Sequence, residues 1–227
     1  LVFAAFSGSH QDAIAKGMKY REEKGLHRWT VPYIPIDPKD ISRTYDADVI
    51  RVNSQSGKGG IGYLLEQTYG YSLPAGMREH FSYLCKSISD REHKELKAGE
   101  ILEIFKSNYF LRSSALSISD MHFYRRGGEV ETEITFCRNG EETTLRACGN
   151  GSLDAVSNAL KAYTKADYVL EVYTEHSMQE QGSGSIAAAY IGLKAPDGSM
   201  AWGAGTDTDI IHAGADALLS AYHNMKS

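Results

Sequence analysis

The second half of the chain contains an internal repeat, and this repeat constrains the fold more than any other feature of the sequence. Gly149-Asn150-Gly151 precedes a helical pattern that ends Ala-Leu-Lys-Ala-Tyr, and Gly203-Ala204-Gly205 precedes one that ends Leu-Leu-Ser-Ala-Tyr. Before each glycine pair stand three segments in which apolar and polar residues alternate, as in half-buried strands. The sequence therefore predicts an α+β fold with two βββα units over residues 113–227, in which two antiparallel sheets pack against two helices.

The limits of these elements follow from the turn residues between them. Arg126-Gly127-Gly128, Arg138-Asn139-Gly140 and Pro196-Asp197-Gly198 have the composition of turns, and Asn-Gly is a strong hairpin signal. We expect strands at 114–124, 129–138, 142–148, 168–176, 185–194 and 199–204, a helix after Gly151 and a last helix from about 208 to 224.

Helical periodicity dominates the chain before the repeat. A first helix has Ser7 or Ser9 as its N-cap and Gly17 or Gly25 as its end. Residues 61–110 are predicted to be helical, with a helix opening at Pro74, a solvated charged connection at 89–97 and a further helix at 98–110.

A proline-rich loop separates these helical regions. Residues 31–38 hold three prolines, which exclude both a regular helix and a central strand. Asp37 and Pro38 then suit the N-cap and first position of a short helix.

Composition excludes several classes of protein. The chain has 227 residues, of which 42% are hydrophobic and 23% charged, as in ordinary globular domains. No apolar run reaches the ~20 residues that span a bilayer, so we expect no membrane partner. The net charge is −5 and no long basic patch occurs, which argues against nucleic acid. The three cysteines form no CxxC motif, so a reducing cytoplasmic location is expected.

The chain begins at Leu1, inside an apolar run and without an initiator Met. We therefore expect it to be part of a longer protein.

Two glycine-rich segments suggest ligand sites. Gly57-Lys58-Gly59-Gly60 fails as a phosphate loop, because Val52 stands where a Walker motif needs glycine. Gly149-Asn150-Gly151 opens a helix whose N–H groups would attract a carboxylate or phosphate. The alternative is a tight strand-to-helix turn that needs a positive φ.

The histidines do not cluster at metal-ligand spacing, so no metal site is expected within the chain. His10 stands beside Ser7, Ser9 and Asp12, and Tyr33 lies in the rigid proline loop. Either side chain is suited to acid–base catalysis or to a structural, solvated role.

Three unusual stretches, at residues 6–14, 31–40 and 50–60, resemble the long form of the 2-isopropylmalate synthase family. They read FSGSHQDAI, VPYIPIDPKD and IRVNSQSGKGG. The resemblance covers essentially the whole chain and is weakest in residues 85–135. It implies linker subdomain I at 1–45, helical linker subdomain II at 46–112 and a leucine-binding allosteric regulatory domain at 113–227.

The resemblance also implies an enzyme. The family's (β/α)8 barrel, which is absent from this chain, condenses acetyl-CoA with 3-methyl-2-oxobutanoate in the first committed step of leucine biosynthesis. That barrel holds a divalent metal (Mg, Mn or Zn), and we expect none in this chain. In the family, the residues that match His10 and Tyr33 reach the active site of the neighbouring subunit of a homodimer. The chain alone should therefore be inactive.

The repeat gains a role from the same resemblance. In the family it binds L-leucine, the feedback inhibitor. The matching positions here are Gly149, Asn150, Gly151, Leu153, Asp154, Tyr173, Ser177, Ala187 and Ile210. Asp154 and Ser177 depart from the small residues that are common at these positions. Two alternatives stay open: a regulatory module of a citramalate or homocitrate synthase, and a dimerisation domain without a ligand.

Overall fold

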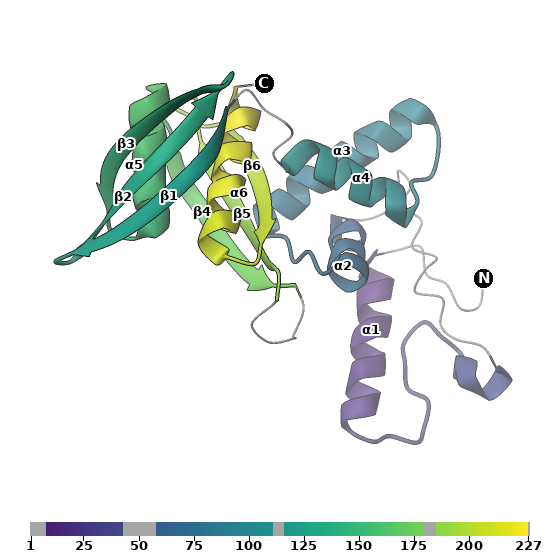
Figure 1. Ribbon diagram of the computed structural model, residues 1–227. Helices are drawn as coiled ribbons and strands as arrows, with labels where there is room; N and C mark the ends of the chain where they lie inside the picture. Colours follow the sequence, from purple (N-terminus) through teal and green to yellow (C-terminus); the bar gives the residue numbers. More distant parts are fainter. Residues whose placement is uncertain (1–7, 43–57, 111–115, 179–184, 227) are drawn as a thin grey trace. The chain divides into compact units, whose positions relative to one another are not determined.

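The computed structural model describes residues 8–42, 58–110, 116–178 and 185–226. The chain divides into two compact units, Leu1–Phe105 (unit 1) and Lys106–Ser227 (unit 2) (Figure 1). None of the helices in these described ranges has the length and apolar character needed to cross a membrane.

Unit 1 is helical, as predicted. It contains α1 (Gly8–Glu23), a 3-10 helix (Pro38–Ile41), α2 (Lys58–Tyr69), α3 (Ala75–Glu92) and most of α4 (Ala98–Tyr109). Its core includes an aromatic cluster, in which the ring of Phe105 lies 5.1 Å from that of Tyr71 and 5.4 Å from that of Phe81. Pro74 immediately precedes α3, so the predicted opening of that helix is confirmed.

The predicted connection at 89–97 is wrong at its start, because α3 continues to Glu92. Ser89 is buried, and its hydroxyl donates to the carbonyl of Lys94 at 2.6 Å. The helix ends at His93, which adopts the left-handed conformation with φ 51°. A run of charges does not end a helix when the charges lie on its solvent face.

The two ends of α1 can be compared with the N-cap and the terminating glycine predicted from the sequence. Ser9 lies inside the helix, and Ser7 falls outside the described residues. Gly25, with φ 59°, follows the end of the helix, and the N–H of Leu26 donates back to the carbonyl of Arg21. Gly17 does not end α1.

Unit 2 consists of two βββα units, so the predicted α+β fold is confirmed. The first comprises β1 (Leu116–Arg126), β2 (Glu129–Arg138), β3 (Glu141–Gly149) and α5 (Ser152–Thr164). The second comprises β4 (Val169–Ser177), β5 (Ala187–Lys194), β6 (Met200–Asp207) and α6 (Ile210–Met225). Each set of strands forms an antiparallel sheet in sequence order. The described residues contain no (β/α)8 barrel.

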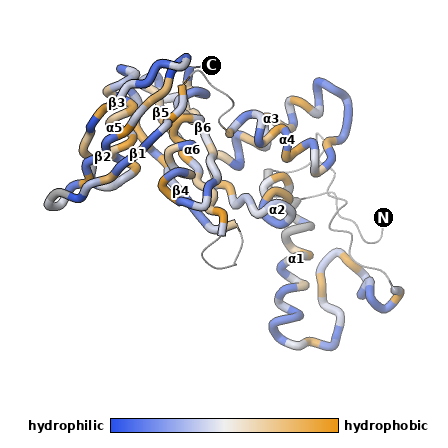
Figure 2. Tube along the Cα trace, viewed as in Figure 1, coloured by the Kyte–Doolittle hydropathy of each residue, from blue (hydrophilic) through white to orange (hydrophobic). Residues whose placement is uncertain are grey.

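Each helix covers its own sheet, and both helices share one core. α5 packs on β2 and β3, α6 packs on β5 and β6, and the two helices contact one another. Along β2, buried residues such as Ile134 and Phe136 alternate with more exposed ones, and Figure 2 shows this alternation as changes of colour along the first sheet. Residues 187–193 of β5 are all buried. α6 lies on one face of this strand, and Trp202 lies against Gly192 on the same sheet.

The second Gly-x-Gly segment, Gly203-Ala204-Gly205, lies within β6, which extends three residues beyond the predicted strand 199–204. α6 begins after Asp209, whose carboxylate caps it. A Cβ on Gly203 would lie 2.2 Å from the carbonyl oxygen of Ala217, and one on Gly205 would lie 2.2 Å from that of Ala213. These glycines are therefore needed because the backbones of β6 and α6 approach closely.

Candidate catalytic and effector sites

His10 and Tyr33 are brought together in unit 1. Their ring centroids lie 4.0 Å apart with 22° between the ring planes, so the two rings are stacked. His10 is on the exposed side of α1, and Tyr33 is 62% exposed in the proline-rich loop. A solvent-facing imidazole against a phenol places the ring nitrogens of a histidine next to a hydroxyl donor. Their roles in catalysis stay predictions.

The backbone of Tyr33 is strained. Its φ is +65°, a left-handed conformation that costs a bulky residue roughly 1–2 kcal/mol. Pro32 before it packs against α1, where a Cβ on Gly17 would lie 2.7 Å from Cδ of the proline ring. Val31 and Ile34 are buried in a small core with Ile14. The loop is thus anchored on both sides of Tyr33 while its ring points outward onto His10.

The predicted effector residues of unit 2 begin at the β3–α5 connection. Gly149 ends β3, and a Cβ there would lie 2.3 Å from the backbone nitrogen of Ala155. Gly151 is the N-cap of α5 with φ −158°, and no side chain caps the helix from that position. The predicted alternative of a turn with positive φ is therefore wrong: Gly149 is required by close contact with the helix, and Gly151 is extended.

Asp154 lies in the first turn of α5. Its Oδ2 accepts a hydrogen bond from the backbone N–H of Asn150 at 2.9 Å. A carboxylate there is stabilised by the partial positive charge of the helix N-terminus.

Leu153 and Tyr173 meet the beginning of α6. A Cβ on Gly214 would lie 3.5 Å from Cδ1 of Leu153 and 3.6 Å from the hydroxyl of Tyr173. Leu153 is in the first turn of α5, and Gly214 is in the second turn of α6. The N-terminal ends of both helices therefore converge beside β4.

The hydroxyl of Tyr173 donates to the carboxylate of Glu175. Burial, and then the neighbouring Glu175, raises the pKa of the Tyr173 phenol above its ordinary value, so the group stays a donor at neutral pH. The sequence reasoning missed both Glu175 and Gly214. A glycine inside a helical pattern is a signal of close packing that could have indicated Gly214.

The other predicted residues lie further along the same sheet. Ser177 pairs with Ala187, which in turn pairs with Asp207, at the end where β6 leads into α6. Ser177 is four residues from Tyr173, roughly 13 Å along the strand. Its hydroxyl contacts that of Ser185. Ile210, the first residue of α6, is 38% exposed. The predicted set thus extends from the start of α5 to the start of α6.

Acidic groups surround the start of α6. Asp209 accepts from the N–H of Ile211 at 2.7 Å. Burial, and secondarily the charge of Asp207, raises the pKa of the Asp216 carboxyl, while His212 acts in the opposite direction. These carboxylates give the site a chemistry that suits an ammonium group.

Two family models match the chain. The model described as alpha-isopropylmalate synthase, post-catalytic domain-like, matches residues 1–66. The model described as LeuA allosteric (dimerisation) domain matches residues 95–226.

Curated relatives agree with these models. A protein named 2-isopropylmalate synthase from Desulfitobacterium hafniense is 50% identical over 225 residues, covering 99% of this chain and 40% of the relative. Proteins of the same name from Helicobacter hepaticus and Agrobacterium fabrum are 46% and 44% identical, again over 99% of this chain and over 41% and 40% of their own lengths. The chain thus spans about 40% of the length of these relatives.

The paired βββα units lie within the match to the LeuA allosteric (dimerisation) domain model, and the chain before them begins with the match to the post-catalytic domain-like model. More particularly, the chain belongs to the 2-isopropylmalate synthase family. The resemblance inferred from the sequence motifs is thereby confirmed.

Proposed function

We propose that this chain is the regulatory part of a 2-isopropylmalate synthase, which condenses acetyl-CoA with 3-methyl-2-oxobutanoate in leucine biosynthesis, and that it confers feedback inhibition by L-leucine. The observation that carries the proposal is the convergence of Leu153, Tyr173 and Gly214 where α5 and α6 begin. This arrangement combines an apolar surface with two helix N-termini and nearby carboxylates.

A zwitterionic amino acid matches that combination. The carboxylate of leucine is attracted to the N-terminus of α5, where Gly151 leaves the helix without a side-chain cap. Its ammonium group faces Glu175, which already accepts a hydrogen bond from Tyr173. Its isobutyl group packs against Leu153 and Ile210.

Inhibition also requires that leucine bind one arrangement of the protein more tightly than another. The coupling between the effector and catalytic sites is typically ~1–3 kcal/mol. We propose a homodimer as the responding assembly, which the description of the matched domain as a dimerisation domain supports.

The proposed contribution to catalysis comes from His10 and Tyr33, acting in the active site of the neighbouring subunit. The imidazole of His10 serves as a general acid or base, and the hydroxyl of Tyr33 donates a hydrogen bond to the oxygen that becomes negative. The described residues do not fit a metal, because no three His, Cys, Asp or Glu side chains lie together. We assign a divalent metal and the condensation itself to the family's barrel. The chain alone is therefore expected to be inactive. Its expected location is the cytoplasm.

Titration calorimetry with L-leucine, combined with light scattering, tests the regulatory role. We expect a dimer that binds about one leucine per chain or per dimer, and we expect Tyr173→Phe to weaken binding. Tyr124→Phe is the matched control, because it removes an exposed phenol hydroxyl from β1 of the same unit. A folded dimer that ignores leucine would contradict the proposal. Binding of isoleucine or lysine instead would favour a citramalate or homocitrate synthase as the parent enzyme.

The catalytic role is tested by joining the chain to the barrel of the Desulfitobacterium hafniense relative. We expect His10→Ala and Tyr33→Phe each to lower kcat by at least about 100-fold. Full activity of both variants would contradict a catalytic role for this pair. Mixing the His10→Ala variant with a variant inactivated in the barrel should restore part of the activity if each subunit serves its neighbour's site, because one site of the mixed dimer then combines an intact barrel with an intact His10 and Tyr33.

A further inference from the structure

The ring of Tyr33 stacks on His10 while the backbone of Tyr33 holds an unfavourable, left-handed conformation. Tyr33 is mostly exposed, so its own side chain supplies little of the packing that fixes the loop. Other residues must therefore maintain its position, and the structure identifies a connected group of three on α1 and on both sides of the loop.

The first of these is Trp29, which precedes Tyr33 in the chain. Its indole Nε1–H donates to the carbonyl oxygen of Ile34 at 2.7 Å. Ile34 directly follows Tyr33, so this bond fixes the Ile34–Pro35 peptide group, one residue beyond the strained backbone of Tyr33. The hydrogen bond between Trp29 and Ile34 thus closes the segment of the loop that contains Tyr33.

The second is Arg21, which projects from the last turns of α1. Its guanidinium carbon lies 5.0 Å from the centroid of the Trp29 ring, in a cation–π arrangement. Its Nη1 also donates to Oδ2 of Asp37 at 3.0 Å. Arg21 thus contacts both Trp29 and Asp37 through its guanidinium group.

The third is Asp37, which is only 8% exposed. Its other oxygen, Oδ1, accepts from the backbone N–H of Lys39 at 3.0 Å and caps the 3-10 helix. A carboxylate this buried needs its cationic partner, because an unpaired buried charge is strongly unfavourable. Arg21 and Asp37 therefore tie α1, which carries His10, to the end of the loop that carries Tyr33.

We propose that Arg21 is a positioning residue, which acts through Trp29 and Asp37 to hold the phenol of Tyr33 over His10. The positioning itself stands on these contacts, whereas its consequence for the reaction rests on the proposed function of His10 and Tyr33. The contacts of Arg21 are with Trp29 and Asp37, so Arg21 acts on the loop that places one of the two stacked rings.

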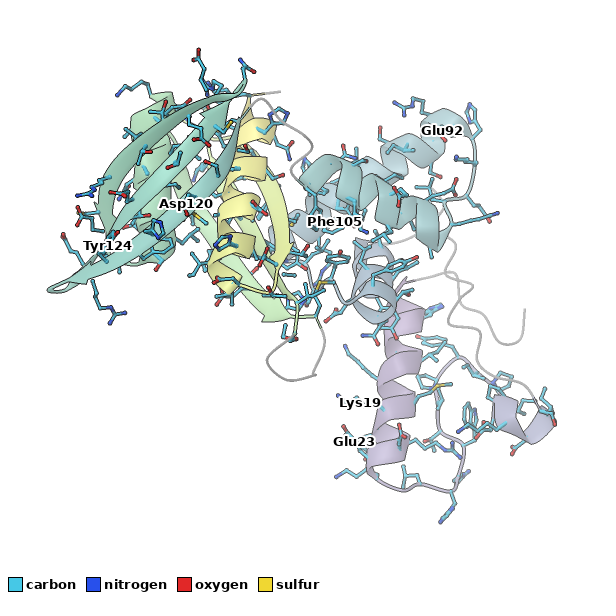
Figure 3. The ribbon with its side chains drawn as sticks, viewed as in Figure 1. Lys19, Glu23, Glu92, Phe105, Asp120 and Tyr124 are labelled. Atoms are coloured by element: carbon cyan, nitrogen blue, oxygen red, sulfur yellow. The ribbon has the colours of Figure 1, made fainter. Side chains whose placement is uncertain are left out.

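The test separates the two statements by measuring the ring stack and the reaction independently. Trp29→Phe keeps an aromatic ring for Arg21 but removes the Nε1–H donor. Arg21→Lys keeps the charge but removes the planar guanidinium. Lys19→Gln is the matched control, because it breaks an exposed ion pair with Glu23 on the same helix; both residues are labelled in Figure 3.

The stack is measured in the 227-residue chain by nuclear Overhauser contacts between the His10 and Tyr33 rings and by the ring-current shift of His10. We expect both signals to weaken in Trp29→Phe and Arg21→Lys and to persist in Lys19→Gln. If Arg21→Lys does not fold, Trp29→Phe carries the test alone, since it leaves the buried ion pair intact. A stack that persists in folded Trp29→Phe overturns the proposal.

The reaction is measured in the fusion with the relative's barrel. We expect Trp29→Phe to lower kcat about 10- to 100-fold with KM nearly unchanged, because a shift of about 1 Å in a catalytic group has effects of this size. In the Tyr33→Phe background the same substitution should change kcat little, since the hydroxyl being positioned is already gone. A further equal loss there would overturn the positioning role. A lost stack with unchanged kcat would leave positioning intact and would instead contradict the catalytic role of His10 and Tyr33.

Discussion

Asp154 and Asn150 are joined by a hydrogen bond in which Oδ2 of the aspartate accepts from the backbone N–H, at 2.9 Å. The negative charge of Asp154 thereby lies beside the N-terminus of α5, where the carboxylate of an amino acid would also be attracted. Asp154 and a bound leucine thus compete for the same positive potential.

Asp154→Ala should therefore strengthen leucine binding by about 2- to 5-fold, since a charge at a helix end is worth ~0.3–1 kcal/mol. The same change should lower the free energy of unfolding by a similar amount, because α5 loses a favourable charge. Calorimetry and urea unfolding measure the two effects. Asp197→Ala is the control: its carboxylate accepts from the N–H of Ser199 at 2.9 Å in a distant turn, so affinity should not change. Weaker leucine binding in Asp154→Ala would mean that Asp154 contacts the ammonium group instead.

Gly149→Ala should lower the free energy of unfolding of unit 2 by about 2–4 kcal/mol, because the added Cβ would lie 2.3 Å from a backbone nitrogen of α5 that cannot move independently. Amide hydrogen exchange in β3 and α5 measures this loss. Gly128→Ala is the matched control, since a Cβ there meets nothing within 4 Å and its φ is not positive. Equal stability of the two variants would mean that the strand and helix separate easily at this contact.

Features that depend on neighbours in the sequence were predictable. Asp37 caps the 3-10 helix and Pro38 opens it, because both effects need only a few adjacent residues. Asn139 and Gly140 form the predicted hairpin turn with positive φ at both positions. The two βββα units follow from alternation and turns repeated along the chain.

Features that depend on distant backbone were not predictable. The glycines of β6 precede a helix in the sequence, but they are required because a Cβ on Gly203 or Gly205 would lie 2.2 Å from a carbonyl oxygen of α6, a contact that no local pattern encodes. The approach of His10 to Tyr33 depends on the fold of the loop over α1. Family motifs drew attention to both residues, but only the structure brings their rings together and reveals Arg21 behind them.

Asp216→Asn should raise the stability of unit 2 at neutral pH. Burial and Asp207 raise the folded-state pKa of this carboxyl above its ordinary value of 3.8, so the folded state holds the proton more tightly than the unfolded state. The free energy of unfolding therefore falls as pH rises from the unfolded pKa through the folded one. Asp216→Asn has no carboxyl at this position, so its free energy of unfolding does not fall with pH for this reason.

The midpoints of urea unfolding, measured between pH 3 and pH 7 for Asp216→Asn and for the unchanged chain, test whether the unchanged chain loses stability as pH rises. The difference should be largest at pH 7 and should disappear as pH falls below about 3.8. Asp90→Asn, an exposed change on α3, serves as control. A stabilisation that grows toward low pH would contradict the assignment, because it would require a carboxyl whose pKa is lowered by folding.

Tyr33→Asn should raise the free energy of unfolding of unit 1 by about 1 kcal/mol, because asparagine tolerates the left-handed conformation that costs tyrosine roughly 1–2 kcal/mol. Tyr33 is 62% exposed, so little packing is lost in exchange. Tyr33→Phe keeps the strain and should leave stability nearly unchanged. Amide hydrogen exchange of α1 measures both variants. A gain in Tyr33→Asn together with lost activity in the fusion would mean that the strain is retained for the sake of the phenol. A destabilised Tyr33→Asn would mean instead that the stack on His10 supports the fold of the loop.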